Sequence, residues 1–304
     1  MKARFLIIPL LLLAACQPVE MDQDKQKTVD EEKPLSGSGY TLTIKATKGD
    51  PQSKALDLSS DGNTLGTYWK NTEKVSVYRE GTCIGTLDVT PDQGEKPQTA
   101  TLSGKLKDGF TLAEGDVLTL LLPRETWSYT GQNSTLTGKG SIEDTYDYAT
   151  ATVTINELLG TEVTTTADAR FQNQQSVYRF GFKEGANWVD IKFFTISAAK
   201  GKLAQTVTYQ NDAWTSVWGG ITVTPAAAPA DHFYYVSLRN DATEQDTYSF
   251  LITGSDYALY TATKDVPAAL LDAPGRFISA KEIAAAKTGF APASGAVSQS
   301  DNVY

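Results

Sequence analysis

The sequence contains few of the residue types on which enzyme active sites and metal centres depend. Its 304 residues include one histidine, His232, and two cysteines, Cys16 and Cys83. A single histidine cannot provide the clustered ligands of a zinc site, and any nucleophile and base pair would rest on that residue alone. A glycine-rich phosphate-binding motif is missing too. We therefore expect no catalysis, no cofactor and no metal, with His232 structural and Cys83 a small core residue.

Hydrophobic runs long enough to cross a membrane as a helix are also missing. The apolar stretch 5–13 follows two basic residues, which is the layout of an export signal. It ends in Leu13-Ala14-Ala15-Cys16, which resembles the lipobox of bacterial lipoproteins. We expect residues 1–15 to be a signal peptide, with cleavage between Ala15 and Cys16 and lipid on Cys16. A lipoprotein carries at least two acyl chains, enough to anchor the body to a membrane.

Positive charge is in deficit. Without the two basic residues of the signal, 25 lysines and arginines remain against 36 acidic residues, a net charge of −11. Nucleic acid is a poor partner for such a chain. Several acids lie in 16–39, where large apolar residues are rare, so we expect a disordered tether there. These acids resemble signals that send lipoproteins to the outer face of the outer membrane, and solubility of a linker is the alternative reading.

Helical periodicity is nearly absent, and period-two alternation takes its place from Tyr40 onward. The predicted strands are 40–46, 75–78, 82–89, 99–106, 117–122, 149–155, 177–182, 188–196, 203–209, 221–224, 233–238, 248–252 and 257–263. Many short strands without crossover helices indicate an all-β protein of antiparallel β-sandwiches. The length of the chain suggests two of them in tandem.

The polar, glycine-containing stretch 159–169 interrupts the apolar pattern and is the predicted domain boundary. We expect an N-terminal sandwich over 40–162, a C-terminal sandwich over 163–288 and a disordered tail over 289–304. One segment stays open at this point. Ser279 and Glu282 have capping-box spacing for a helix, but 276–283 could equally be a last strand.

Several short segments, spread over both halves of the chain, carry a family resemblance. They are 67–69, 75–78, 112–116, 127–132 and 146–151 in the first half, and 169–173, 177–182 and 220–224 in the second. Together these segments resemble the fimbrillin family of type V pilin-like surface lipoproteins. The resemblance covers most of the chain from Tyr40 to about residue 277.

The resemblance implies two transthyretin-like domains in a structural or adhesive subunit of surface fimbriae, delivered as an outer membrane lipoprotein. It implies other fimbrial subunits as partners, joined by donor-strand exchange. In polymerising members a protease cuts after a basic residue beyond the first strand and releases that strand. The matching position here is Lys54-Ala55, where lysine replaces the usual arginine, so an uncut surface lysine is the alternative.

A carbohydrate-binding or host-adhesion lipoprotein that does not polymerise is the competing interpretation. Trp214 and Trp218 are the best candidates for stacking on a glycan. The alternative for this pair is a hairpin whose aromatic residues pack against the body of the protein. A host protein is the other partner that this interpretation allows.

Overall fold

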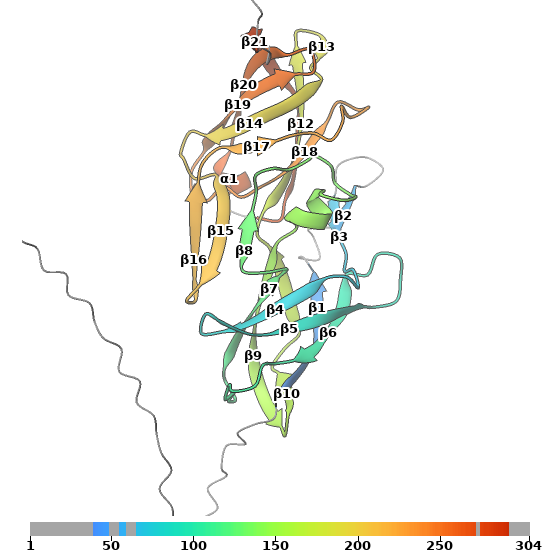
Figure 1. Ribbon diagram of the computed structural model, residues 1–304, viewed down its shortest axis with the longest axis vertical. Coiled ribbons are helices and arrows are strands. Elements are labelled where there is room, and N and C mark those ends of the chain that lie inside the picture. The colour runs from blue at the N-terminus through green and yellow to red at the C-terminus, as the bar shows by residue number, and fades with distance from the viewer. Residues whose placement is uncertain (1–38, 49–54, 59–64, 272–273, 292–304) are drawn as a thin grey trace, which may run out of the picture. The chain divides into compact units, whose positions relative to one another are not determined.

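The computed structural model describes residues 39–48, 55–58, 65–271 and 274–291. Their regular structure is nearly all β (Figure 1), as the sequence predicts. Within these ranges the helical segments are a π-type turn, Ile142–Tyr146, and the short helix α1, Ala268–Leu271. Neither has the length and hydrophobicity of a membrane-crossing helix.

The first sheet has eight strands and closes on itself, because β1 pairs with strands at both ends of the strand order. The order is β10-β1-β11-β9-β7-β4-β5-β6, with further pairings of β1 to β6 and of β10 to β9. The strands are β1 (Thr41–Lys48), β4 (Lys74–Arg79), β5 (Thr82–Pro91), β6 (Thr99–Lys105), β7 (Val117–Leu122), β9 (Ala149–Leu159), β10 (Glu162–Thr165) and β11 (Ala169–Asn173).

The second sheet also has eight strands, and its last strand is long. It runs β13-β12-β21-β20-β19-β14-β17, with β18 paired to β12. The strands are β12 (Ser176–Glu184), β13 (Asn187–Trp188), β14 (Ile191–Ala198), β17 (Ile221–Val223), β18 (Tyr234–Leu238), β19 (Asp246–Gly254), β20 (Ala258–Val266) and β21 (Phe277–Phe290). The segment left open between helix and strand is therefore strand, within β21.

Two smaller sheets complete the fold. One is β16-β15-β8, made of Ala213–Trp218, Ala204–Gln210 and Thr126–Ser128, and the other pairs β2 (Ala55–Leu58) with β3 (Leu65–Thr67). In the first of these, Val207 of β15 is registered with Trp127 of β8. A strand from the first half of the chain thus pairs with one from the second.

The sheets are not purely antiparallel, and the expectation of antiparallel sandwiches is wrong in this respect. β1 runs parallel to both β10 and β11, and β12 runs parallel to β21. Parallel partners require a long connection, which the intervening strands of the sheet supply. Alternation within a single strand carries no information about the direction of its neighbours, so the sequence pattern could not reveal this.

Two main clusters of buried apolar side chains lie within the described residues. One is lined by the strands of the first sheet, from Leu42 to Phe171. The other gathers the second half of the chain, and Trp127, Tyr129 and Tyr148 pack into it as well. The first sheet therefore extends past residue 162, the expected division, to the end of β11, and a segment before that division contributes to the other core.

Candidate functional site

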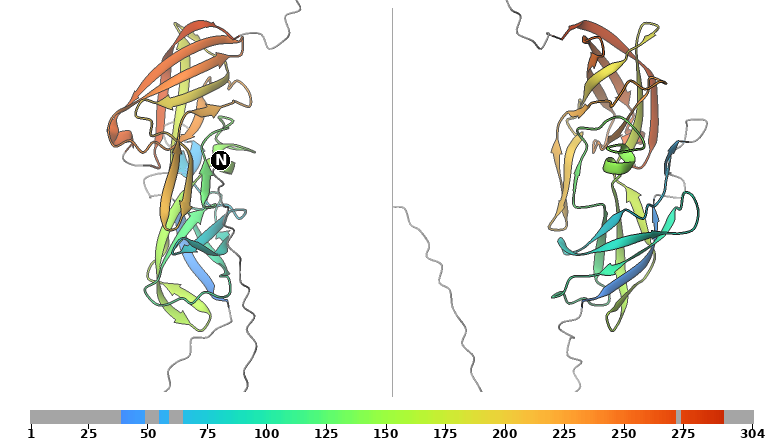
Figure 2. Two further views of the ribbon diagram at one scale, coloured as in Figure 1. Left: turned by 60° about the vertical axis from the view of Figure 1, so that its left-hand side comes forward. Right: turned by 45° about the vertical axis from the view of Figure 1, so that its right-hand side comes forward.

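The first strand has a special place in the first sheet, since it has partners on both of its edges. On one edge β1 pairs antiparallel with β6, from Thr41 opposite Lys105 to Thr47 opposite Thr99. Its other edge pairs with β10 at Thr41 and Leu42 and with β11 from Ala46 to Lys48. Figure 2 shows β1, in blue, beside these green-yellow strands. Removing β1 would leave unpaired backbone groups on both sides of the gap.

The side chains of β1 alternate between the core and the surface, as the period-two pattern predicts. Leu42, Ile44 and Ala46 point into the first core and are almost completely buried. Lys45 points outward, where its ammonium group meets Asp92 at 2.9 Å. The strand therefore contributes backbone pairing to the sheet and apolar side chains to the core.

The fourth inward position of β1 is a lysine. Lys48 ends the strand with only 3% of its side chain exposed, and its Nζ lies 2.6 Å from Glu73 Oε1 and 2.8 Å from Asp147 Oδ2. The ring of Trp69 lies beside the same ammonium group, with its centroid 5.4 Å from Nζ. Glu73 immediately precedes β4 and Asp147 lies just before β9, so this ion triad ties β1 to two other strands.

Charge attraction governs the protonation of Lys48. Burial alone would lower the pKa of its ammonium group, but the neighbouring carboxylates of Asp147 and Glu73 outweigh this and raise the pKa well above its usual value. The backbone of Lys48 is held too, since its N–H donates to the Gln98 carbonyl at 3.1 Å and its carbonyl accepts from Thr67 Oγ1 at 3.3 Å. The end of β1 is thus fixed by both backbone and side-chain bonds.

Several solved structures are similar to this chain at low sequence identity. A candidate cell adhesion protein from Bacteroides ovatus is 12% identical, with 84% of this chain and 100% of that chain covered and a TM-score of 0.42. Another from Bacteroides uniformis is 14% identical, with 83% and 99% covered and a TM-score of 0.40. The C-terminally truncated tip fimbrial protein Mfa3 from Porphyromonas gingivalis is 9% identical, with 76% and 81% covered and a TM-score of 0.37.

No family model matches the chain, and a search of curated proteins finds no match. The three solved structures named above have TM-scores below 0.5 and show no function for this chain.

The predicted processing residues fall largely outside the described part of the chain. Ala15, Cys16 and Lys54 all lie there, so lipidation and both cleavage sites remain predictions. Ala55, which would follow the second cut, is the first residue of β2 and is registered with Thr67 of β3. The predicted cut at Lys54-Ala55 therefore falls between β1 and β2.

The two candidate glycan-stacking tryptophans have different surroundings. Trp214 is partly buried, with ring centroids 4.4 Å from Trp127 and 4.8 Å from Tyr209. Trp218 lies at the end of the same strand with 38% of its surface exposed, and Lys202 Nζ is 5.1 Å from its ring. The structure thus places Trp214 in a packed aromatic group, while Trp218 alone of the pair offers an exposed ring.

His232 and Cys83 lie in different parts of the fold. His232 stacks on Trp188 with ring centroids 5.5 Å apart, and its Nδ1 is 3.1 Å from Asp190. Cys83 is free and half-buried, and it packs beside the cluster that contains Tyr78. The described residues contain no group of three or more histidine, cysteine or acidic side chains arranged to hold a metal ion.

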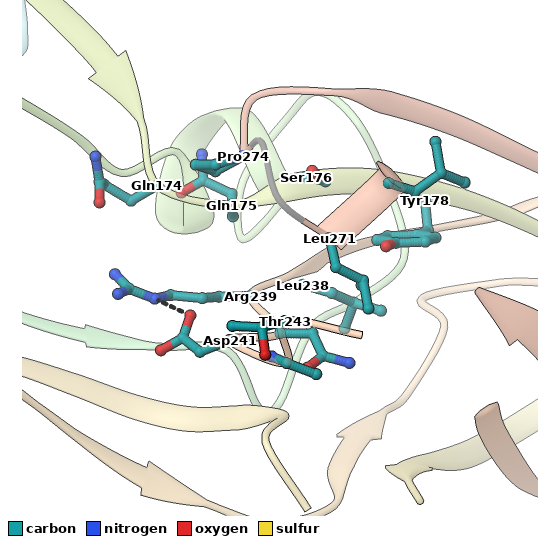
Figure 3. A pocket seen from close by; sticks show the side chains of 13 residues that line it. Gln174, Gln175, Ser176, Tyr178, Leu238, Arg239, Asp241, Thr243, Leu271 and Pro274 are labelled. Carbon is teal, nitrogen blue, oxygen red and sulfur yellow. Dashed lines mark hydrogen bonds and ion pairs between the residues drawn. The ribbon is translucent and has the colours of Figure 1, made fainter. Parts of the chain in front are cut away.

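A cavity of about 320 Å³ lies beside the start of β12 and the end of β18 (Figure 3). Arg239 and Asp241 pair on its wall at 2.9 Å, and Asn240 donates to Asp246 at 2.8 Å. The described lining also includes the amide side chains of Gln174 and Gln175, the ring of Tyr178 and two leucines of α1, and it includes neither histidine nor cysteine. Such a lining can hydrogen bond a polar molecule.

Sequence reasoning missed the ion triad of Lys48. Only the lysine had a signal in the sequence. Lys48 lies two residues beyond the predicted strand 40–46, and it continues the alternation of Leu42 and Ile44, so a strand that ran on to Lys48 would point it inward. Glu73 and Asp147 gave no such signal. Each lies in a connection between strands, and only the closed pairing of the sheet brings the two carboxylates to the end of β1.

Proposed function

We propose that this chain is a fimbrillin-like surface lipoprotein whose first strand is released by proteolysis and replaced by a strand from another subunit. It would then be a structural or adhesive subunit of a fimbrium, with two transthyretin-like sandwich domains and no catalytic role. Its partners would be other fimbrial subunits, and its location the outer membrane and cell surface.

The observation that carries this proposal is the place that β1 occupies in the first sheet, between β6 on one edge and β10 and β11 on the other, which we call the seat of β1. The strand has hydrogen-bonded partners along both edges and buries three apolar side chains, Leu42, Ile44 and Ala46. Burial of a leucine or isoleucine side chain stabilises a protein by about 1.5–3 kcal/mol each. A sheet that lost β1 would expose an apolar trench with unpaired edges, and a strand supplied by another chain can fill such a trench.

The position of the predicted cut supports the same proposal. Cleavage at Lys54-Ala55 would separate β1 from the rest of the chain and leave β2 and its partner β3 on the retained side. A fragment that begins before Thr41 would carry away the lipid on Cys16 together with the strand. The lipid would then act in delivery to the surface, and assembled subunits would no longer hold it.

Mass spectrometry of the protein from the surface of its own cells tests this proposal. We expect chains that begin at Ala55 in ladders of high molecular weight that resist mild detergent. The variant Lys54→Gln should remain uncut, keep its lipid on Cys16 and run as a monomer. Lys45→Gln, which changes an exposed lysine within β1, should behave like the natural chain. Natural chains that uniformly begin at lipidated Cys16 and run as monomers would contradict the proposal.

Glycan binding has weaker support. It needs exposed aromatic rings on one surface, and Trp214 is instead packed between Trp127 and Tyr209. Trp218 remains exposed, but a single ring does not favour glycan binding over strand exchange.

A further inference from the structure

The two lysines of β1 differ in what surrounds them. Lys45 is 54% exposed and pairs with Asp92, itself 38% exposed. Lys48 is 3% exposed and pairs with Glu73 and Asp147, which are 17% and 7% exposed. Exposed pairs contribute little, whereas removal of one partner from a buried group leaves an uncompensated charge. The seat of β1 therefore has one position that depends on positive charge.

The carboxylates of this triad are held in place by groups outside β1. The backbone N–H of Lys70 donates to Glu73 Oε2 at 2.8 Å, and the Gln175 side chain donates to Asp147 Oδ1 at 3.5 Å. The Lys70 ammonium group is directed elsewhere, to Glu143 at 2.9 Å. Within the described part of the chain, Lys48 supplies the ion pairs of both carboxylates. If β1 left, two negative charges would remain at one end of the empty seat.

We propose that Glu73 and Asp147 make the seat of β1 selective for a strand that carries a basic residue at its fourth inward position. The replacing segment comes from another subunit and is extended, with apolar side chains at three alternate positions followed by lysine or arginine at the next. The inference rests on the proposed strand exchange and adds a rule for which strand is accepted. The apolar positions supply burial, and the basic residue supplies discrimination among apolar strands.

Peptide exchange into the full chain tests the rule. A specific protease site inserted between Asp50 and Pro51 allows the strand to be cut from the folded protein. Fluorescent peptides of residues 39–48 are then added, and their incorporation is followed by anisotropy. The natural peptide and its Lys45→Met form should bind within about twofold of each other, while the Lys48→Met peptide should bind about tenfold more weakly or worse. Equal binding of the Lys48→Met and natural peptides would overturn the inference.

A variant of the protein without the two carboxylates provides a second test of the rule. In a full chain with Glu73→Gln and Asp147→Asn, the buried charges are gone and the amides keep a similar shape. The Lys48→Met peptide should then bind at least as well as the natural one. A persistent preference for the natural peptide in this variant would show that the carboxylates are not its cause, and the inference would fail.

Measurements on the uncut protein distinguish a failure of this inference from a failure of the proposed strand exchange. If no peptide enters, not even the natural one, strand exchange fails, and the selectivity is then decided by unfolding of the uncut protein in urea. Lys48→Met should lower the midpoint and Lys45→Met should not. Adding Glu73→Gln and Asp147→Asn to Lys48→Met should recover most of the loss. An unchanged midpoint for Lys48→Met would overturn the inference even if exchange occurs.

Discussion

A single glutamine side chain takes the place of a neighbouring strand along β18. The Gln132 amide group accepts from the Ser237 backbone N–H at 2.8 Å and donates to the Ser237 carbonyl at 2.7 Å, as a paired residue of a sheet would. It also donates to the Tyr129 carbonyl at 2.7 Å, and the residue is fully buried. This side chain therefore links the segment around Tyr129 to the second sheet.

Replacement of this glutamine should be costly. Gln132→Leu keeps the volume but leaves the Ser237 N–H and carbonyl groups buried without this partner, so the free energy of unfolding should fall by about 3 kcal/mol. Urea unfolding followed by tryptophan fluorescence measures it. The control is Gln93→Leu, at an exposed position, which should change stability by less than about 0.5 kcal/mol. Equal losses for the two variants would show that the amide network is not stabilising.

The two tryptophans of β16 should respond differently to truncation. Trp214→Ala removes the ring that packs against Trp127 and Tyr209, so the free energy of unfolding should fall by about 2 kcal/mol. Trp218→Ala removes a ring that is 38% exposed and should cost less than about 0.5 kcal/mol. Thermal unfolding measured by circular dichroism compares them. A greater loss for Trp218→Ala would contradict the packing role of Trp214.

At the scale of elements, two hairpin turns meet. Gly81, in the turn between β4 and β5, has a φ of +69°, and a Cβ atom there would lie 2.5 Å from the Asn211 Cα, in the turn between β15 and β16. Only glycine allows this approach, because any side chain would collide with backbone atoms. The contact joins the first sheet to the sheet that contains β15.

Comparison of Gly81 with Gly160 separates the effect of a steric collision from the effect of backbone strain. Gly160 turns between β9 and β10 with a φ of +64°, and a Cβ atom there would meet nothing within 4 Å. Gly160→Ala should therefore cost only the left-handed conformation, about 1 kcal/mol. Gly81→Ala carries the same strain plus the collision and should cost at least about 2 kcal/mol more. Urea midpoints measure both, and equal midpoints would mean that the two turns separate easily.

Strands could be predicted where side chains alternate over a sufficient length. β1, β4, β7 and β9 have this pattern, and their predicted ranges overlap the observed ones. The very short β8 and β13 offer too few residues for alternation to register. In β21 the alanine run suits a helix by propensity, and it is the partners β12 and β20 that select the strand. The seat of Lys48 depends on such distant partners in the same way.

For the whole molecule, buried tyrosines make stability sensitive to alkaline pH. Burial raises the pKa values of Tyr148 and Tyr234 to about 12 and those of Tyr129 and Tyr178 further. In the unfolded chain tyrosine ionises near pH 10. Above that pH the unfolded state releases protons that the folded state retains, so the stabilisation is complete below about pH 10 and is lost as the pH rises toward 12.

Unfolding in urea at several pH values tests this dependence. The free energy of unfolding should vary little between pH 8 and 9 and fall steeply between pH 10.5 and 11.5. Tyr178→Phe removes one such group and should reduce the slope in that range by about 1.4 kcal/mol per pH unit. A slope unchanged by this substitution would mean that Tyr178 ionises alike in both states.

The pairing of β1 also has a consequence for the order in which the protein takes shape. Its neighbours are β6, β10 and β11, and the last of its registered partners is Phe171. Pairing over such separations must overcome the entropy of closing long loops. β1 can pair with β6 as soon as residue 105 has been synthesised, but its other edge stays open until β10 and β11 exist. More than half of the chain must therefore be present before both edges of β1 are paired.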